Sequence, residues 1–205
     1  MATITEPAEP EAGLATEYPP HRMTVERYER LARSGVYGED EPVFLWRGRL
    51  VEKMTPGMPH VFVVSTLTRQ FFGMVPEGWC SYHEQPIVVG DDSMPEPDIS
   101  IVRGSLRDFL KRRPTARDVA LIIEVSDSSL AIDSGDVLRA YAAESIPFYW
   151  IVNIRKGRVE VYSDPSGPGE APSYRTRRDY GPADEVPVVL DGVEVGRIAA
   201  REFLP

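Results

Sequence analysis

The sequence lacks the features that identify secreted, membrane-spanning or disulfide-stabilised proteins. Its single cysteine, Cys80, excludes a disulfide within the chain and reads as a packed thiol rather than a nucleophile. No window approaches the roughly 18 uncharged apolar residues of a membrane-spanning helix. The N-terminus has neither the basic start nor the apolar run of a secretory signal. We therefore expect a cytoplasmic protein that makes no membrane contact.

Several chemical motifs are absent as well. His21 and His83 have no acidic or cysteine partner at the spacing of zinc ligands. The glycines form neither a phosphate-binding loop nor a dinucleotide fingerprint. The serines of segment 126–129 have no histidine base nearby and no flanking glycines of a nucleophile elbow. Zinc, nucleotide-cofactor and serine-hydrolase chemistry are therefore disfavoured.

The composition is that of one globular domain preceded by a tail. The chain has 205 residues, of which 42% are hydrophobic and 27% charged, so it can bury a sizeable core. Residues 1–20 are rich in proline, glutamate and alanine and contain no lysine or arginine, so we expect an acidic, disordered tail. Residues 21–205 are then a single domain. The net charge of −9 argues against an indiscriminate nucleic-acid binder.

The apolar pattern predicts a mixed central β-sheet flanked by helices, an α/β fold. Helices are expected at 25–33, after Thr24 as N-cap, at 60–74 and at 136–144. A hairpin is expected over 44–52, turning at Arg47-Gly48. Further strands are expected at 79–89, 98–102, 121–125, 148–152, 158–163, 186–190 and 192–195.

Two carboxylates at the ends of apolar, β-branched runs are the strongest functional signal. Asp98 begins the run 98–102, and Glu124 lies near the end of the run 119–125. A carboxylate at the end of a buried strand is costly to desolvate unless it has a partner, and Mg²⁺ is such a partner because it prefers oxygen ligands. The alternative is structural, since acids at strand ends also cap turns or pair with arginine.

One basic segment lies between these two acids. Segment 103–117 carries six basic residues against Asp108 alone. It reads either as a contact for a phosphate backbone or as a solvated helix face. The residues assigned to the nucleic-acid contact are Arg103, Arg107, Lys111, Arg112 and Arg113.

The order of these segments resembles the Uma-type family of restriction endonucleases, which have the PD-(D/E)XK nuclease fold. The resemblance rests on Pro97-Asp98, on segment 123–130, on Asp133 and on segment 146–152, and it extends over roughly 23–205. It implies a restriction-endonuclease-like fold and a Mg²⁺- or Mn²⁺-dependent endonuclease that hydrolyses DNA. It makes Asp98 and Glu124 the catalytic metal ligands, with the Val125 carbonyl as a further ligand.

The chain departs from the family pattern at the catalytic lysine. In the general motif a lysine lies two residues after the Glu, where this chain has Ser126. In the Uma-type pattern the lysine lies on the following helix, at the position of Val137 here. Arg139 is on the same helix but should point about 200° away from Val137. Lys53 could replace the catalytic lysine only if the hairpin folds over the sheet.

Three further residues are candidates for lining the site. His60 matches a position where the family often has histidine, although a capping or surface role is the simpler interpretation. Gln85 reaches the same cleft if its strand alternates regularly, and Asp133 matches a family position.

Two functional classes remain open. One is the DNA endonuclease, for which cutting both strands suggests a homodimer. The other is a catalytically inactive nuclease-fold protein that acts as a nucleic-acid-binding or interaction module. The acidic pair favours the first, whereas Val137, Ser134 in place of an arginine, Phe44 in place of an acid, and the net charge favour the second.

Overall fold

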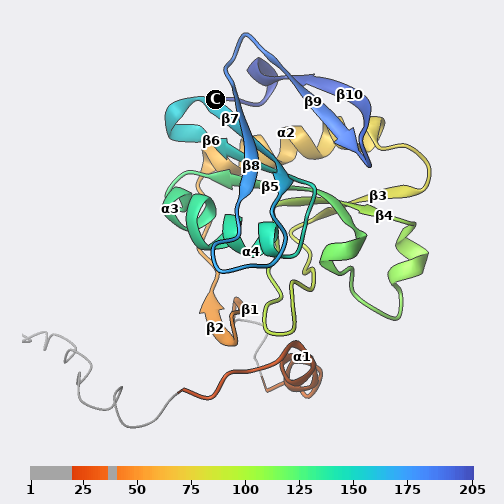
Figure 1. Cartoon of the computed structure of the whole chain (residues 1–205), viewed down its shortest axis with the longest axis vertical. Helices are drawn as coiled ribbons and strands as arrows, with labels where there is room; N and C mark the ends of the chain where they lie inside the picture. The colour runs from red at the N-terminus through yellow and green to blue at the C-terminus, as the bar shows by residue number, and fades with distance from the viewer. Residues whose placement is uncertain (1–19, 37–40) are drawn as a thin grey trace, which may run out of the picture.

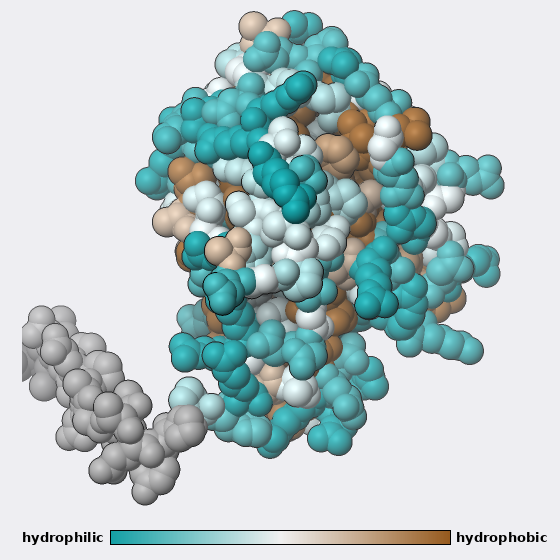
Figure 2. All heavy atoms as spheres, viewed as in Figure 1, coloured by the Kyte–Doolittle hydropathy of each residue, from teal (hydrophilic) through white to brown (hydrophobic). Residues whose placement is uncertain are grey.

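A computed structural model describes residues 20–36 and 41–205 of the chain (Figure 1). The expectation of a disordered tail over 1–20 lies outside the described residues, apart from residue 20. None of the helices within the described ranges combines the length and hydropathy needed to cross a bilayer. The face shown in Figure 2 is mostly hydrophilic, with hydrophobic side chains in separate patches.

A six-stranded mixed sheet forms the centre of the molecule and confirms the expected α/β architecture. Its strands follow one another in chain order, and only β5 and β6 are parallel. A parallel pair needs a crossover, and the helical segment between β5 and β6 supplies it. The strands are β3 (Trp79–His83), β4 (Ile99–Arg103), β5 (Val119–Ser126), β6 (Phe148–Asn153), β7 (Arg158–Pro165) and β8 (Tyr174–Tyr180).

Each face of the sheet is covered by different elements. Helix α2 (Met58–Met74) and the hairpin of β9 (Glu185–Leu190) and β10 (Val193–Ala199) pack on one face, around Phe71, Ile123 and Phe203. The crossover covers the other face, around Ile122, Tyr141 and Tyr149. It consists of α3 (Leu130–Ile132), the π-helical turn η4 (Asp133–Val137) and α4 (Leu138–Ala143). Short 3₁₀ helices lie at η2 (Leu106–Phe109), η3 (Ala116–Asp118), η5 (Ile154–Lys156) and η6 (Ala200–Glu202).

The N-terminal elements form a small layer beside the sheet (Figure 1). They are α1 (Val25–Arg33), capped by Thr24 as expected, and the hairpin of β1 (Val43–Trp46) and β2 (Arg49–Glu52). The hairpin turns at Arg47 and Gly48, whose φ angles of 47° and 72° suit a two-residue turn. Leu45 of β1 is fully buried against Tyr28 and Met94, which anchors the hairpin to the rest of the protein.

Three sequence expectations about the elements were wrong. The strand expected over 79–89 stops at His83, because Glu84 has a left-handed backbone (φ 50°) and Pro86 follows. The helix expected over 136–144 is preceded by helical residues from Leu130 onward and contains a π-turn. Strand β8 was not expected, because it is an exposed edge strand of mostly polar residues that only its pairing with β7 identifies.

Candidate active site

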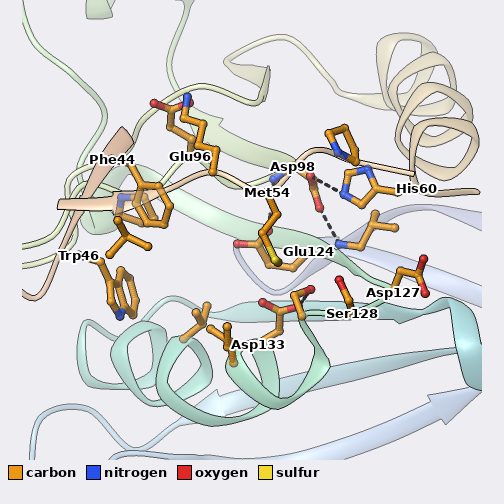
Figure 3. Close-up of a pocket in the computed structure, with 18 of the residues that line it drawn as sticks. Phe44, Trp46, Met54, His60, Glu96, Asp98, Glu124, Asp127, Ser128 and Asp133 are labelled. Carbon is orange, nitrogen blue, oxygen red and sulfur yellow. Dashed lines mark hydrogen bonds and ion pairs between the residues drawn. The ribbon is translucent and has the colours of Figure 1, made fainter. Parts of the chain in front are cut away.

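Asp98 immediately precedes β4 and lies beside Glu124 of the neighbouring strand β5. Ile99 of β4 faces Ile123 of β5, so the next positions outward bring Asp98 opposite Glu124. The backbone N–H of Asp98 donates to Oε2 of Glu124 at 3.4 Å. The two strand-end acids that the sequence singled out therefore meet at one edge of the sheet, and both line the same pocket (Figure 3).

The Asp98 carboxylate is held at both oxygens. His60 Nε2 lies 3.1 Å from Oδ1, and the backbone N–H of Val125 donates to Oδ2 at 2.7 Å. His60 is in the first turn of α2, so the pair joins that helix to the sheet. The hydrogen bond to Asp98 raises the pKa of His60 above its ordinary value of 6.5. His60 thus lies in the site, rather than serving only as a cap or surface residue.

Within the described residues, no cationic side chain forms a hydrogen bond or ion pair with Glu124. The Tyr141 hydroxyl of α4 donates to its Oε1 at 2.9 Å. Burial of the carboxylate, followed by the negative charges of Asp98 and Asp133, raises the pKa of Glu124 well above 4.5. Burial and the neighbouring Glu124 also raise the pKa of Tyr141. This corner of the pocket therefore has an excess of negative charge that a cation would neutralise.

Asp133 begins the π-turn and forms the opposite wall. The hydroxyls of Ser126 and Ser129 donate to its Oδ2 at 2.5 and 2.6 Å. Burial raises the pKa of Asp133, although these two hydrogen bonds act in the other direction. The Tyr149 hydroxyl donates to its backbone carbonyl at 3.2 Å, which fixes the start of the turn. The predicted site residue Asp133 is thus brought to the pocket.

The pocket has a volume of about 1130 Å³ and contrasting walls. Phe44 and Trp46 of the β1–β2 hairpin stand on one side, and His60 and Asp127 on another (Figure 3). Its acidic lining residues are Glu52, Glu84, Glu96, Asp98, Glu124, Asp127, Asp133 and Asp136, and its basic ones are Lys53, His60 and Arg139. Acids outnumber bases, so the pocket itself would repel a phosphate group that arrived without a cation.

The donor set fits a hard divalent cation that is held by few protein ligands. Within the described ranges, no three His, Cys, Asp or Glu side chains form a group that could hold a metal ion. Asp98 and Glu124 nevertheless offer neighbouring, partly buried carboxylates, and the hydrogen bonds of Glu124 come from no cationic group. Mg²⁺ commonly binds one or two carboxylates and completes its shell with water and phosphate oxygens. The Val125 carbonyl stays a predicted ligand.

The family's lysine position also lies in the pocket. Val137 lines the pocket, which agrees with its expected cleft-facing orientation. Lys53 lines it too, because the hairpin does fold over the site, and its ammonium pairs with Glu96. Arg139 also reaches the lining and pairs with Asp136 at 2.9 Å. Arg139 reaches the lining because its long side chain extends toward Asp136, so its expected direction about 200° away from Val137 stays a prediction.

The structure does not bring the basic segment to this pocket. None of the five assigned residues, Arg103, Arg107, Lys111, Arg112 and Arg113, is among its lining residues. Arg103 pairs with Asp191, Arg112 with Asp118 and Arg113 with Glu29. Gln85 is exposed and also lies outside the lining, because β3 ends before it and the strand alternation is lost.

Tyr141 is a site residue that the sequence interpretation missed. The sequence feature that could have identified Tyr141 is its position four residues after Val137, because residues at this spacing lie on the same side of a helix. Phe44 and Trp46 were likewise not assigned to the site. The signal for these two is their alternation in a strand around the apolar Leu45.

Comparisons with known proteins identify the family and the fold. The family model Uma2, described as "Putative restriction endonuclease", matches residues 25–197. A crystal structure of a putative nuclease belonging to DUF820 from Anabaena variabilis ATCC 29413 is similar, with a TM-score of 0.66 and 16% sequence identity. That match covers 89% of this chain and 97% of the other, and at this identity it shows the fold. No curated protein matches the chain.

Proposed function

Because the chain belongs to the Uma2 family of restriction endonuclease-like proteins, we propose that it is a nuclease that hydrolyses DNA with the help of Mg²⁺ or Mn²⁺. One observation carries the proposal. Asp98, just before β4, lies beside Glu124 of the adjacent strand β5, and both carboxylates line one pocket. DNA is the proposed partner, and a homodimer would supply the two sites needed to cut both strands of a duplex.

Asp98 and Glu124 are the proposed metal ligands, together with the Val125 carbonyl. A divalent cation bound there lowers the pKa of a water molecule and offsets charge on the phosphoryl oxygens. The protein's own task is to hold the two carboxylates in place. Val125 N–H and His60 fix the two oxygens of Asp98, and the Tyr141 hydroxyl fixes Glu124. His60 and Tyr141 are therefore positioning residues in this proposal.

A second candidate function is a nuclease-fold protein that binds nucleic acid or a partner without cleaving it. Val137 favours this alternative, because valine can neither orient an attacking water nor stabilise negative charge. The two long cations in the pocket, Lys53 and Arg139, are each paired with an acid. Losing one electrostatic donor typically costs about a hundredfold to a thousandfold in rate, so weak cleavage is the expected level.

Plasmid cleavage in Mg²⁺ or Mn²⁺ tests the proposal. We expect slow, metal-dependent nicking that Asp98→Asn and Glu124→Gln both abolish. Asp191→Asn is the matched control, because Asp191 is an exposed acid paired with Arg103 outside the pocket, and it should leave cleavage unchanged. Cleavage that survives both pocket substitutions would refute the assignment. The absence of cleavage in all proteins, with DNA binding retained, would favour the second candidate.

A further inference from the structure

Two aromatic side chains face the pocket without belonging to the core. Phe44 and Trp46 flank Leu45 in β1, and successive strand residues point to opposite sides. Leu45 is fully buried in the cluster with Tyr28 and Met94. Phe44 and Trp46 line the pocket instead, and within the described residues neither is a member of the three hydrophobic clusters. These partly exposed rings therefore contribute a surface to the pocket.

The spacing of the two rings suits a planar guest. Residues i and i+2 of a strand lie about 6.6 Å apart along the strand axis. Stacked bases lie about 3.4 Å apart, so one base held between two rings needs about 6.8 Å. Figure 3 shows Phe44 and Trp46 on one side of the pocket, with Asp98 and Glu124 across from them. The aromatic side and the acidic corner thus lie within one pocket.

The hairpin also carries the positive charge of this region. Segment 43–53 contains Arg47, Arg49 and Lys53 against Glu52 alone. Arg47 pairs with Asp136 and Lys53 pairs with Glu96, but their side chains remain 45% and 40% exposed. Both therefore keep N–H groups that can contact a phosphate group beside the pocket. Aromatic rings combined with cations are the means by which proteins bind single-stranded nucleic acid. The opposite wall is acidic, so the phosphate chain would follow the hairpin side.

We propose that the pocket binds an unpaired nucleotide with its base between Phe44 and Trp46. Its phosphate chain would follow the hairpin side, and only the phosphate that meets a bound divalent cation would be directed toward Asp98 and Glu124. This inference rests on the proposed function and adds a substrate class to it. A base in an intact duplex is paired and stacked on its neighbours, so it would have to leave the stack to enter the pocket. Single-stranded DNA therefore binds better than blunt duplex DNA of the same sequence.

Trp46 makes this binding directly measurable. Fluorescence is titrated with a 12-nucleotide oligothymidylate in Mg²⁺, in a Glu124→Gln background so that cleavage does not interfere. We expect the single strand to quench the fluorescence, and the same strand annealed to oligoadenylate to quench it far less. Because the Trp46 variants lack the reporting ring, their affinities are measured by the fluorescence anisotropy of a dye-labelled strand. Trp46→Ala should weaken single-strand binding about 5- to 150-fold, the range typical of one stacked base. Trp46→Phe should restore most of the affinity, because it keeps an aromatic ring.

Trp79→Phe is the matched control. Trp79 lies outside the pocket, with Arg103 over its ring at 5.0 Å, so this variant should keep both the quench and the affinity. Equal binding of single strand and duplex, or unchanged binding by a folded Trp46→Ala, would overturn the inference. Cleavage that needs Asp98 but not Trp46 would reject the inference alone. A quench that depends on Trp46, in a protein whose native sequence cleaves nothing, would support the inference and reject the proposed nuclease.

Discussion

Two glutamates at the same level of the central sheet have opposite surroundings. Glu124 on β5 faces Ile151 on β6, and Ile151 in turn faces Glu160 on β7. The two acids are thus two strands apart, or about 10 Å, in one row across the sheet. Asp98 follows Glu124 at one end of this row. At the other end, Asp179 of β8 lies opposite Glu160 in the strand register.

The Glu160 end of the row is neutralised by its neighbours. Glu160 is only 3% exposed, and its carboxylate accepts hydrogen bonds from Asn153, Arg158 and Tyr162 and an ion pair from Arg177. Burial raises the pKa of Glu160, but the hydrogen bonds outweigh that effect and lower it overall. The pKa of Glu124 rises instead, first because the protein buries its carboxylate and then because Asp98 and Asp133 add negative charge.

Under the proposed function, the difference separates an acid that stabilises the fold from one that binds the metal ion. Buried charges with complete hydrogen bonding hold a structure together, whereas uncompensated ones persist where a ligand supplies the missing charge. Four experiments, from the largest expected effect to the smallest, test this contrast.

Glu160→Ala should destabilise the protein by about 3–5 kcal/mol, because it leaves Arg158 and Arg177 without their buried partner. The measurement is the free energy of unfolding in urea. Asp164→Asn is the control, since Asp164 forms an exposed pair with Arg175, and it should change stability by less than about 1 kcal/mol. If the two substitutions cost the same, Glu160 is not the anchor that its contacts indicate.

Val137→Lys would place a cationic side chain near Glu124, as Arg158 and Arg177 already are near Glu160. Its stem can lie along the apolar wall of the pocket. Plasmid cleavage in Mn²⁺ should rise about a hundredfold, as expected for one catalytic electrostatic group. The gain should vanish when Glu124→Gln is added. A folded Val137→Lys protein that gains no activity would favour the inactive binding module.

Mg²⁺ or Mn²⁺ should stabilise the native protein by binding to Asp98 and Glu124. At ten times the dissociation constant the gain is about 1.4 kcal/mol, which raises the melting temperature by about 3–5 °C. Asp98→Asn should abolish this shift, and Asp191→Asn should retain it. A shift that persists in Asp98→Asn would place the metal elsewhere.

Glu124→Gln should raise metal-free stability by about 1 kcal/mol near pH 7, because it removes an uncompensated buried charge while Tyr141 can still donate. The pKa of Glu124 is raised in the folded state, so ionisation destabilises the wild type progressively as the pH rises above about 4.5. The advantage of the variant should therefore grow from pH 4.5 toward neutrality.

Glu160 gives the opposite pH dependence, because its folded-state pKa is lowered. Its contribution to stability is present above about pH 4.5 and is lost as the pH falls through the folded-state pKa. Urea unfolding across this pH range, in EDTA, measures both effects. Parallel pH profiles for Glu124→Gln and Glu160→Ala would contradict the contrast between the two acids.

Much of the fold could be predicted from local sequence. Thr24 marked the start of α1, Arg47-Gly48 marked the hairpin turn, and apolar runs marked β5 and β6. Each of these signals acts within a few residues, where capping, turn chemistry and periodicity operate. Strand β8 has no such signal, because its polar residues become a strand only by pairing with β7.

The sequence by itself determined which residues could bear chemistry. Strand-end acids such as Asp98 and Glu124 are costly to bury, so their positions in apolar runs are informative without a structure. The order of the motifs also determined the family resemblance, which the match over residues 25–197 confirms.

Only the tertiary structure decided how those residues are surrounded. It paired His60 with Asp98, placed Tyr141 on Glu124, and turned Phe44 and Trp46 toward the pocket. It also separated the basic segment from the acidic pair, although the two are adjacent in sequence. The reason is physical, since pKa values and charge compensation depend on contacts between strands and helices far apart in the chain, which no local pattern encodes.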